Sequence, residues 1–124
     1  MSTSSTGEFA FIDSLRRALP PLPPQEGIGI GDDAAFLGNL PGGILLSTDL
    51  SVEGVHFRTD WSTPEEFVDK AFVSNLSDVN AMGGTPEWIL LGLGIPAGAP
   101  DSLLPALREA VSLASRRRGA TVVR

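Results

Sequence analysis

The 124-residue sequence contains no cysteine and no tyrosine, and it has a single lysine and a single histidine. The absence of cysteine excludes disulfides, thiolate metal sites and thiol nucleophiles, and it is typical of a reducing compartment. No stretch approaches the roughly 20 apolar residues that span a bilayer. The Ser/Thr-rich start lacks the basic region and apolar run of a secretory signal. We therefore expect a cytoplasmic protein without a membrane partner.

Aromatic residues are also scarce, at 6% of the chain, so the core must rest mainly on Leu, Ile, Val and Ala. The net charge is −6, but it is unevenly distributed. Residues 1–90 carry thirteen acidic and four basic side chains, whereas residues 91–124 carry two acidic and five basic ones. Nucleic acids bind basic stripes. The acidic charge of residues 1–90 therefore predicts that the protein has no nucleic-acid partner, and it favours a site that binds cations.

Helical periodicity occurs in three segments of what we expect to be one domain, residues 1–124. The first, 8–19, ends at a proline-rich stretch that cannot continue a helix. The second begins near Thr63, which forms a capping box with Glu66, and it ends at two glycines. The third runs from Asp101, the expected N-cap, to the arginines 116–118, which suit the negative end of the helix dipole.

Strand patterns occur between these helices. The segment 44–50 is rich in β-forming residues and follows a glycine-rich turn, which predicts a hairpin with 34–37. The nearly continuous apolar run 88–95 predicts a central strand, and 120–123 begins another. The expected fold class is α/β (α+β), with about four strands in a mixed sheet and helices on one face. The other sheet face needs a partner, and a symmetric dimer is the simplest one.

Acidic residues gather at three places: Asp32 with Asp33, Asp49 after Ser47 and Thr48, and Asp78 on the second helix. Hard oxygen ligands are those that Mg²⁺ selects. If the carboxylates converge, each pair repels by about 1 kcal/mol at ~4 Å in water and about 4 kcal/mol near a protein surface, so a cation would be needed between them. Solvated carboxylates and local caps are the alternative interpretation.

The nucleotide-binding motifs of other folds are absent. Residues 27–31 do not form a Rossmann fingerprint, because its third glycine would fall on Asp32. Lys70 lies on a predicted helix without the glycine pattern of a Walker A loop, so it is expected to be solvated or ion-paired. The sequence leaves three roles open for His56, namely substrate binding, base catalysis and structural hydrogen bonding.

Several motifs together resemble those of the thiamine-monophosphate kinase family, within the AIR synthetase superfamily. They occur in the family's order and spacing from about Gly7 onward. They are Gly7-Glu8-Phe9, Gly29-Ile30-Gly31-Asp32-Asp33-Ala34, Ser47-Thr48-Asp49, Glu53-Gly54-Val55-His56-Phe57, Lys70-Ala71, Asn75-Leu76-Ser77-Asp78 and Ala81-Met82-Gly83.

The resemblance implies ATP-dependent, magnesium-assisted phosphorylation of thiamine monophosphate to thiamine diphosphate by a homodimer whose amino-terminal sheets pair into a barrel. It implies that His56 contacts the substrate and that Asp32 is an additional or supporting group. No covalent nucleophile is expected, because phosphoryl transfer rests on positioning and charge neutralisation. The implied metal ligands are Asp33, Ser47, Thr48, Asp49 and Asp78.

The family pattern continues, after a strand like 121–123, into Gly-Gly-Asp-Thr and a carboxy-terminal domain, whereas this sequence ends at Arg124. We therefore expect the amino-terminal part of such an enzyme, and the isolated part to be inactive if it needs the rest. The alternatives are another ATP-using enzyme of the superfamily, such as an aminoimidazole ribonucleotide synthetase or a hydrogenase-maturation dehydratase, and a non-catalytic dimerisation or metal-binding module.

Overall fold

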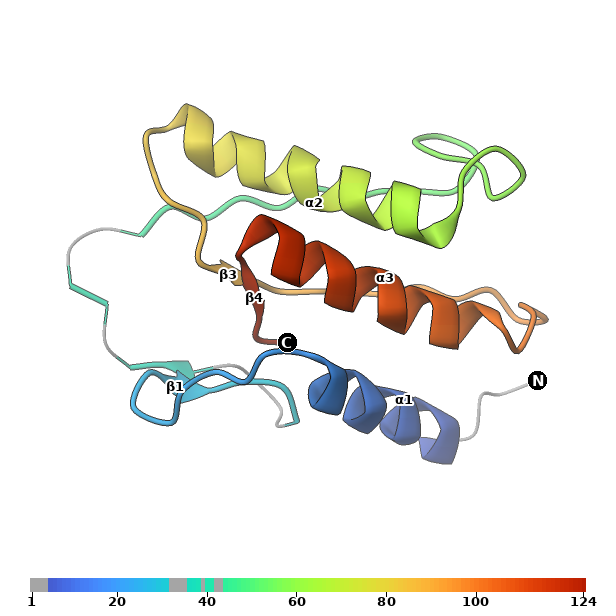
Figure 1. Cartoon of the computed structure of the whole chain (residues 1–124), viewed down its shortest axis with the longest axis horizontal. Helices are drawn as coiled ribbons and strands as arrows, with labels where there is room; N and C mark the ends of the chain where they lie inside the picture. The colour runs from blue at the N-terminus through green and yellow to red at the C-terminus, as the bar shows by residue number, and fades with distance from the viewer. Residues whose placement is uncertain (1–4, 32–35, 39, 42–43) are drawn as a thin grey trace.

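The computed structural model of the chain describes residues 5–31, 36–38, 40–41 and 44–124, so Asp32 and Asp33 lie outside the described residues. Helices and extended segments alternate along the chain (Figure 1). In order, the elements are α1 (Ser5–Ala18), β1 (Gly27–Ile28), β2 (Phe36–Leu37), α2 (Pro64–Ala81), β3 (Trp88–Ile89), α3 (Leu103–Arg118) and β4 (Thr121–Val122).

The three helices form a layer in which α3 lies between α1 and α2 (Figure 1). Apolar side chains at helical spacing on each of them meet in one core, as the periodicity predicts. Phe72 of α2 is 4% exposed and Val111 of α3 is 1% exposed. The buried members of the core are Leu15, Leu19, Phe67, Val68, Phe72, Leu107, Ala110, Val111, Ala114 and Val122.

The ends of α2 confirm the sequence prediction, whereas the start of α3 does not. The Glu66 amide donates to Thr63 Oγ1 at 3.3 Å, and the Thr63 amide donates to Glu66 Oε2 at 3.0 Å, which completes the capping box. Asp101 is not the N-cap of α3. That position is Ser102, whose side chain makes no capping bond, and the third residue of the helix is Pro105, which has no N–H to donate to a cap. The Leu103 N–H bonds instead to the Pro100 carbonyl at 2.9 Å.

The predicted four-stranded sheet is not present in the described part of the chain, which contains two separate two-stranded sheets. In the first, β1 and β2 pair antiparallel; in the second, β3 and β4 pair parallel. The observed hairpin therefore joins 36–37 to 27–28, not to 44–50. Segments 44–50 and 90–95 contain none of the assigned strands, because an apolar run becomes a strand only where a neighbouring backbone pairs with it. Leu46 is accordingly 90% exposed.

Polar groups on α3 hold the neighbouring chain ends. Ser112 Oγ donates to the Ala18 carbonyl at the end of α1 at 3.0 Å, and Arg116 donates to the same oxygen at 3.3 Å. Ser115 Oγ donates to the Ala120 carbonyl before β4 at 2.7 Å. Both serines are 2% exposed, so these bonds satisfy hydroxyls that would otherwise be costly to bury.

The arginines at the end of α3 also connect it to α2. Arg118 binds both Asp69 oxygens, at 3.1 and 2.6 Å, and Arg117 contacts Glu65 at 3.2 Å. The hydrogen bond from Arg118, more than any other contact, lowers the pKa of Asp69 below its usual value of 3.8.

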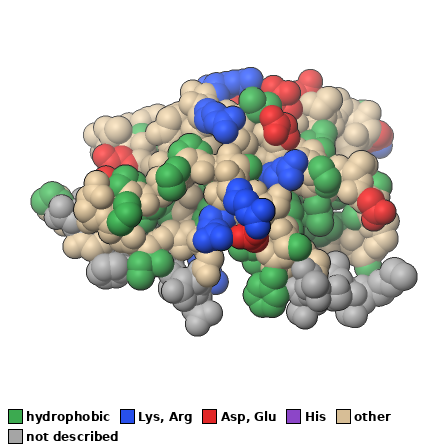
Figure 2. Space-filling model, turned by 60° about the horizontal axis from the view of Figure 1, so that its bottom comes forward, with side chains coloured by type: hydrophobic (Ala, Val, Ile, Leu, Met, Phe, Trp, Pro, Cys, Tyr) green, Lys and Arg blue, Asp and Glu red, His purple; other side chains and the backbone are tan. Residues whose placement is uncertain are grey.

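Lys and Arg side chains gather in the middle of the face shown in Figure 2, with hydrophobic side chains between them.

Among the helices of the described residues, none combines the length and the apolar character needed to cross a membrane.

Candidate functional site

A residue of the Ser47-Thr48-Asp49 motif contacts Asp78 where segment 44–50 passes α2. Ser47 Oγ donates to Asp78 Oδ2 at 3.3 Å, although the two residues are 31 positions apart. Gly84, after the end of α2, lies close to the same segment, because a Cβ built there would lie 2.5 Å from Leu45 Cδ1. A side chain at position 84 would therefore have to displace the end of the Leu45 side chain.

Asp49 and Asp78 remain open to a cation. Both are exposed, and the ion pairs found among the described residues use other carboxylates, those of Asp13, Asp60, Glu65 and Asp69. Asp49 Oδ1 accepts the amide N–H of its neighbour Leu50 at 2.8 Å. These oxygens are hard donors of the kind that Mg²⁺ prefers.

The described residues contain no group of three or more His, Cys, Asp or Glu side chains placed to hold a metal ion. They supply one part of the predicted ligand set, namely Ser47, Asp49 and Asp78, with exposed Thr48 between the first two in sequence. Asp33 and its neighbour Asp32 lie outside the described residues. The complete metal-ligand set therefore stays a prediction.

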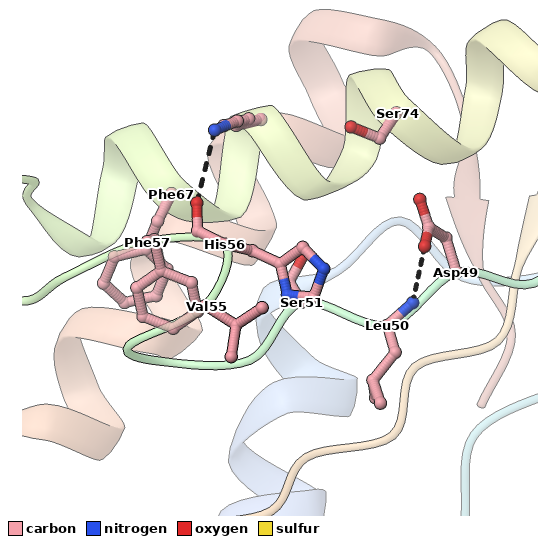
Figure 3. A pocket seen from close by; sticks show the side chains of 9 residues that line it. Asp49, Leu50, Ser51, Val55, His56, Phe57, Phe67 and Ser74 are labelled. Carbon is pink, nitrogen blue, oxygen red and sulfur yellow. Dashed lines mark hydrogen bonds between the residues drawn. The ribbon is translucent and has the colours of Figure 1, made fainter.

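A cavity of about 260 Å³ opens beside Asp49, between the loop that follows it and α2 (Figure 3). One part of its wall is polar and carries both signs of charge, and the other is apolar. Its lining residues are Asp49, Leu50, Ser51, Val55, His56, Phe57, Phe67, Lys70 and Ser74.

His56 lies on a tight loop that folds back on itself. The His56 amide donates to the Val52 carbonyl at 2.9 Å, and the Gly54 amide donates to the Phe57 carbonyl at 2.8 Å. Gly54 has a φ of 82°, which a side chain would oppose. The sequence Glu53-Gly54-Val55 is therefore suited to this turn, which holds the imidazole at the cavity wall.

A backbone hydrogen bond fixes the neutral tautomer of His56. The Val52 N–H donates to His56 Nδ1 at 2.9 Å, so Nδ1 cannot carry the proton of the neutral ring. The proton is therefore on Nε2, and that nitrogen presents a donor. Of the three roles that the sequence left open, this geometry favours hydrogen bonding to a ligand over proton abstraction.

Two contacts attach this loop to α2. The rings of Phe57 and Phe67 stack with centroids 4.2 Å apart and an interplanar angle of 17°. One turn further along the helix, Lys70 Nζ donates to the His56 carbonyl at 3.3 Å, the left-hand dashed line of Figure 3. Sequence reasoning assigned Lys70 to solvent or an ion pair and missed this contact. Its signal is the i, i+3 spacing of Phe67 and Lys70, which puts both on one helix face.

Comparison with known proteins identifies the family of the chain. The family described as AIR synthase related protein, N-terminal domain, matches residues 31–123. The thiamine-monophosphate kinase of Mycobacterium tuberculosis is 39% identical over 117 residues, 94% of this chain and 35% of the relative. The enzymes of the same name from Bacillus subtilis and Escherichia coli are 39% identical over 87 residues and 45% identical over 71, covering 68% and 56% of this chain and 26% and 21% of those relatives. The chain thus spans about a third, or less, of the length of these curated relatives.

Proposed function

Because the chain belongs to the family of AIR synthase related proteins and matches its N-terminal domain, we propose that it is the metal- and nucleotide-binding part of a thiamine-monophosphate kinase. Such an enzyme transfers a phosphoryl group from ATP to thiamine monophosphate and forms thiamine diphosphate. The observation that carries the proposal is the meeting of Ser47 with Asp78 beside a cavity that contains His56. This arrangement supports the proposal because Asp49 and His56 line the same cavity.

The donor chemistry of the site fits Mg²⁺. Asp49 and Asp78 supply exposed carboxylates, and Ser47 and Thr48 supply hydroxyls from the segment between 44 and 50. We propose that these residues hold the metal together with Asp33, and that Asp32 supports them. The bound Mg²⁺ would neutralise charge on the triphosphate and on the transferred group.

The remaining residues bind and orient the substrate. Phosphoryl transfer needs no covalent protein nucleophile, so the site depends on positioning. His56 Nε2–H donates a hydrogen bond to the substrate, while the stacked rings of Phe57 and Phe67 hold the His56 loop in place. The apolar wall of the cavity, which includes Leu50 and Val55, covers the organic part of the substrate.

We also propose a homodimer, which would cover the apolar side chains exposed along 44–55 and 90–95. Leu46, Leu50 and Leu90 are 90%, 72% and 70% exposed. Large apolar side chains exposed in such numbers along two segments favour an interaction surface. Sedimentation equilibrium should show a dimer for the wild-type chain and a shift toward monomer for Leu46→Glu. A wild-type chain that stays monomeric at high concentration would contradict the homodimer.

Substitution of Asp78 by Asn tests the metal site. The side-chain oxygen of Asn can still accept the Ser47 hydroxyl, but the substitution removes the charge that binds the cation. For the wild-type chain, Mg²⁺ at 100 times its dissociation constant should raise the unfolding free energy by about 2.7 kcal/mol. Asp78→Asn should lose most of this gain, whereas Asp101→Asn, an exposed acid before α3, should keep it.

The assay is thermal unfolding with and without Mg²⁺, followed by additions of ATP and thiamine monophosphate. If Asp78→Asn gains as much stability from Mg²⁺ as the wild type, Asp78 is not a ligand. If thiamine monophosphate, added with Mg²⁺, stabilises the wild type no more than inorganic phosphate does, the proposed substrate is wrong.

A further inference from the structure

Lys70 is the one cation on the wall of the cavity, and its charge is not used within the described residues. The ion pairs there are all made by arginines, and the described bond of Lys70 is to the neutral His56 carbonyl. An ammonium group has three donors, so a single bond to a carbonyl leaves two. A bond to a neutral acceptor also leaves the positive charge uncompensated.

The same cavity has a second donor of hydrogen bonds in its lining, the side chain of His56. The Lys70 ammonium contacts the backbone of His56, and the side chain of that same residue carries its proton on Nε2. The hydroxyls of Ser51 and Ser74 add further polar groups to the wall. The apolar lining residues are Leu50, Val55, Phe57 and Phe67. A cavity whose lining combines a cation and an N–H donor with aliphatic and aromatic side chains matches an organic phosphate monoester.

We propose that Lys70 is a specificity-determining residue that binds the phosphate of the acceptor substrate, with His56 Nε2–H donating to the same group. This inference rests on the proposed function and deepens it, because it explains how the site selects a phosphorylated acceptor over the free alcohol. Asp49 lies in the same cavity and would repel a phosphate. Its proposed role as a magnesium ligand removes that conflict, so the phosphate would lie between the metal side of the cavity and Lys70.

A purely structural role for Lys70 makes a different prediction. If the ammonium only held the His56 carbonyl, its removal would loosen the loop and weaken every ligand equally. If it binds the phosphate, its removal would weaken phosphorylated ligands and leave unphosphorylated ones unchanged. The ratio of the two affinities therefore separates the roles.

The experiment uses the chain in Mg²⁺ and compares the wild type with Lys70→Met, Lys70→Arg and the control Arg58→Met. Arg58 is a nearby cation that pairs with Asp60 at 2.6 Å, lies over the ring of Trp61 and does not line the cavity. The probes are inorganic phosphate, thiamine monophosphate and thiamine. Binding is followed by the NMR signals of His56, which are unambiguous because the chain has one histidine.

We expect Lys70→Met to bind phosphate and thiamine monophosphate about tenfold more weakly while its affinity for thiamine is unchanged. Lys70→Arg should restore most of the loss, and Arg58→Met should match the wild type. The proposal for Lys70 is overturned if phosphate leaves the His56 signals of the wild type unmoved, or if Lys70→Met retains the wild-type ratio of thiamine monophosphate to thiamine affinity. A different result would refute only the proposed substrate. If phosphate binding depends on Lys70 but the chain binds thiamine monophosphate no better than phosphate, the anion site at Lys70 stands and thiamine monophosphate is not the substrate.

Discussion

The stack of Phe57 on Phe67 should determine whether the His56 loop stays on α2, and truncation of Phe57 tests this directly. Burying a side chain of this size contributes about 1.5–3 kcal/mol, and an aromatic pair adds about 0.5–1.5 kcal/mol. Phe57 keeps part of its surface in water. We therefore expect Phe57→Ala to cost about 2 kcal/mol, less than the roughly 3–5 kcal/mol of a fully buried Phe.

Urea denaturation followed by circular dichroism measures this cost. With a slope of about 1–3 kcal/mol per molar urea, the midpoint of Phe57→Ala should fall by about 1 M. Phe57→Leu retains most of the apolar volume and loses the stack, so its midpoint should fall about half as far. Val55→Ala is the matched control on the same loop, since Val55 is 76% exposed, and it should stay within about 0.5 kcal/mol of the wild type.

Hydrogen exchange then locates the effect. The amides of Gly54 and His56 are bonded to the carbonyls of Phe57 and Val52, and both should lose protection in Phe57→Ala before the amides of α2 do. If Phe57→Ala keeps wild-type stability and both amides stay protected, the stack does not hold the loop, and the reasoning about the cavity wall fails with it.

Two further predictions concern the helices that position the site. Thr63→Ala removes the acceptor of the Glu66 amide and should cost about 1 kcal/mol in urea denaturation; an unchanged midpoint would show that the capping box does not stabilise α2. Asp69→Asn removes the partner of Arg118, whose hydrogen bond lowers the pKa of Asp69. Because the pKa of Asp69 is lower in the folded chain than in the unfolded chain, ionised Asp69 stabilises the fold at pH values above the unfolded-state pKa. The variant should therefore be less stable than the wild type at pH 7. The difference should shrink below pH 3.8 and vanish below the folded-state pKa. A difference that is independent of pH would contradict the pairing, and the exposed Asp101→Asn serves as the control.

The helices could be predicted from the sequence because their signals are local. The capping box at Thr63 and Glu66 and the apolar stripe through Phe72 are fixed by residues within one or two turns. Gly119, with a φ of 68°, ends α3 where the arginine run indicated. The N-cap of α3 was predicted wrongly at Asp101. Local sequence does not show whether a side chain or a backbone bond forms the first turn of a helix.

The strands and the candidate site could not be predicted fully from the sequence, because both depend on contacts between residues that are far apart in the chain. An apolar run such as 88–95 indicates burial or pairing but does not say which backbone pairs with it, and only Trp88–Ile89 became a strand. The convergence of Asp33, Asp49 and Asp78 stays a prediction, and the observed contact between two of their motifs is the hydrogen bond from Ser47 to Asp78. The contact of Lys70 was missed because the i, i+3 spacing with Phe67 indicates a shared helix face but does not show which backbone carbonyl lies there.

The two buried serines of α3 have a consequence for how this fold tolerates change. Apolar packing is indifferent to direction, so a core built only of Leu and Val lets neighbouring segments slide by small amounts when side chains are exchanged. The hydroxyls of Ser112 and Ser115 donate hydrogen bonds, which are directional, so each bond requires one geometry of the carbonyl that it contacts. These bonds therefore fix the positions of the end of α1 and the beginning of β4 relative to α3. Exchanges among the surrounding aliphatic residues should therefore alter the stability of the domain while leaving the alignment of these segments intact.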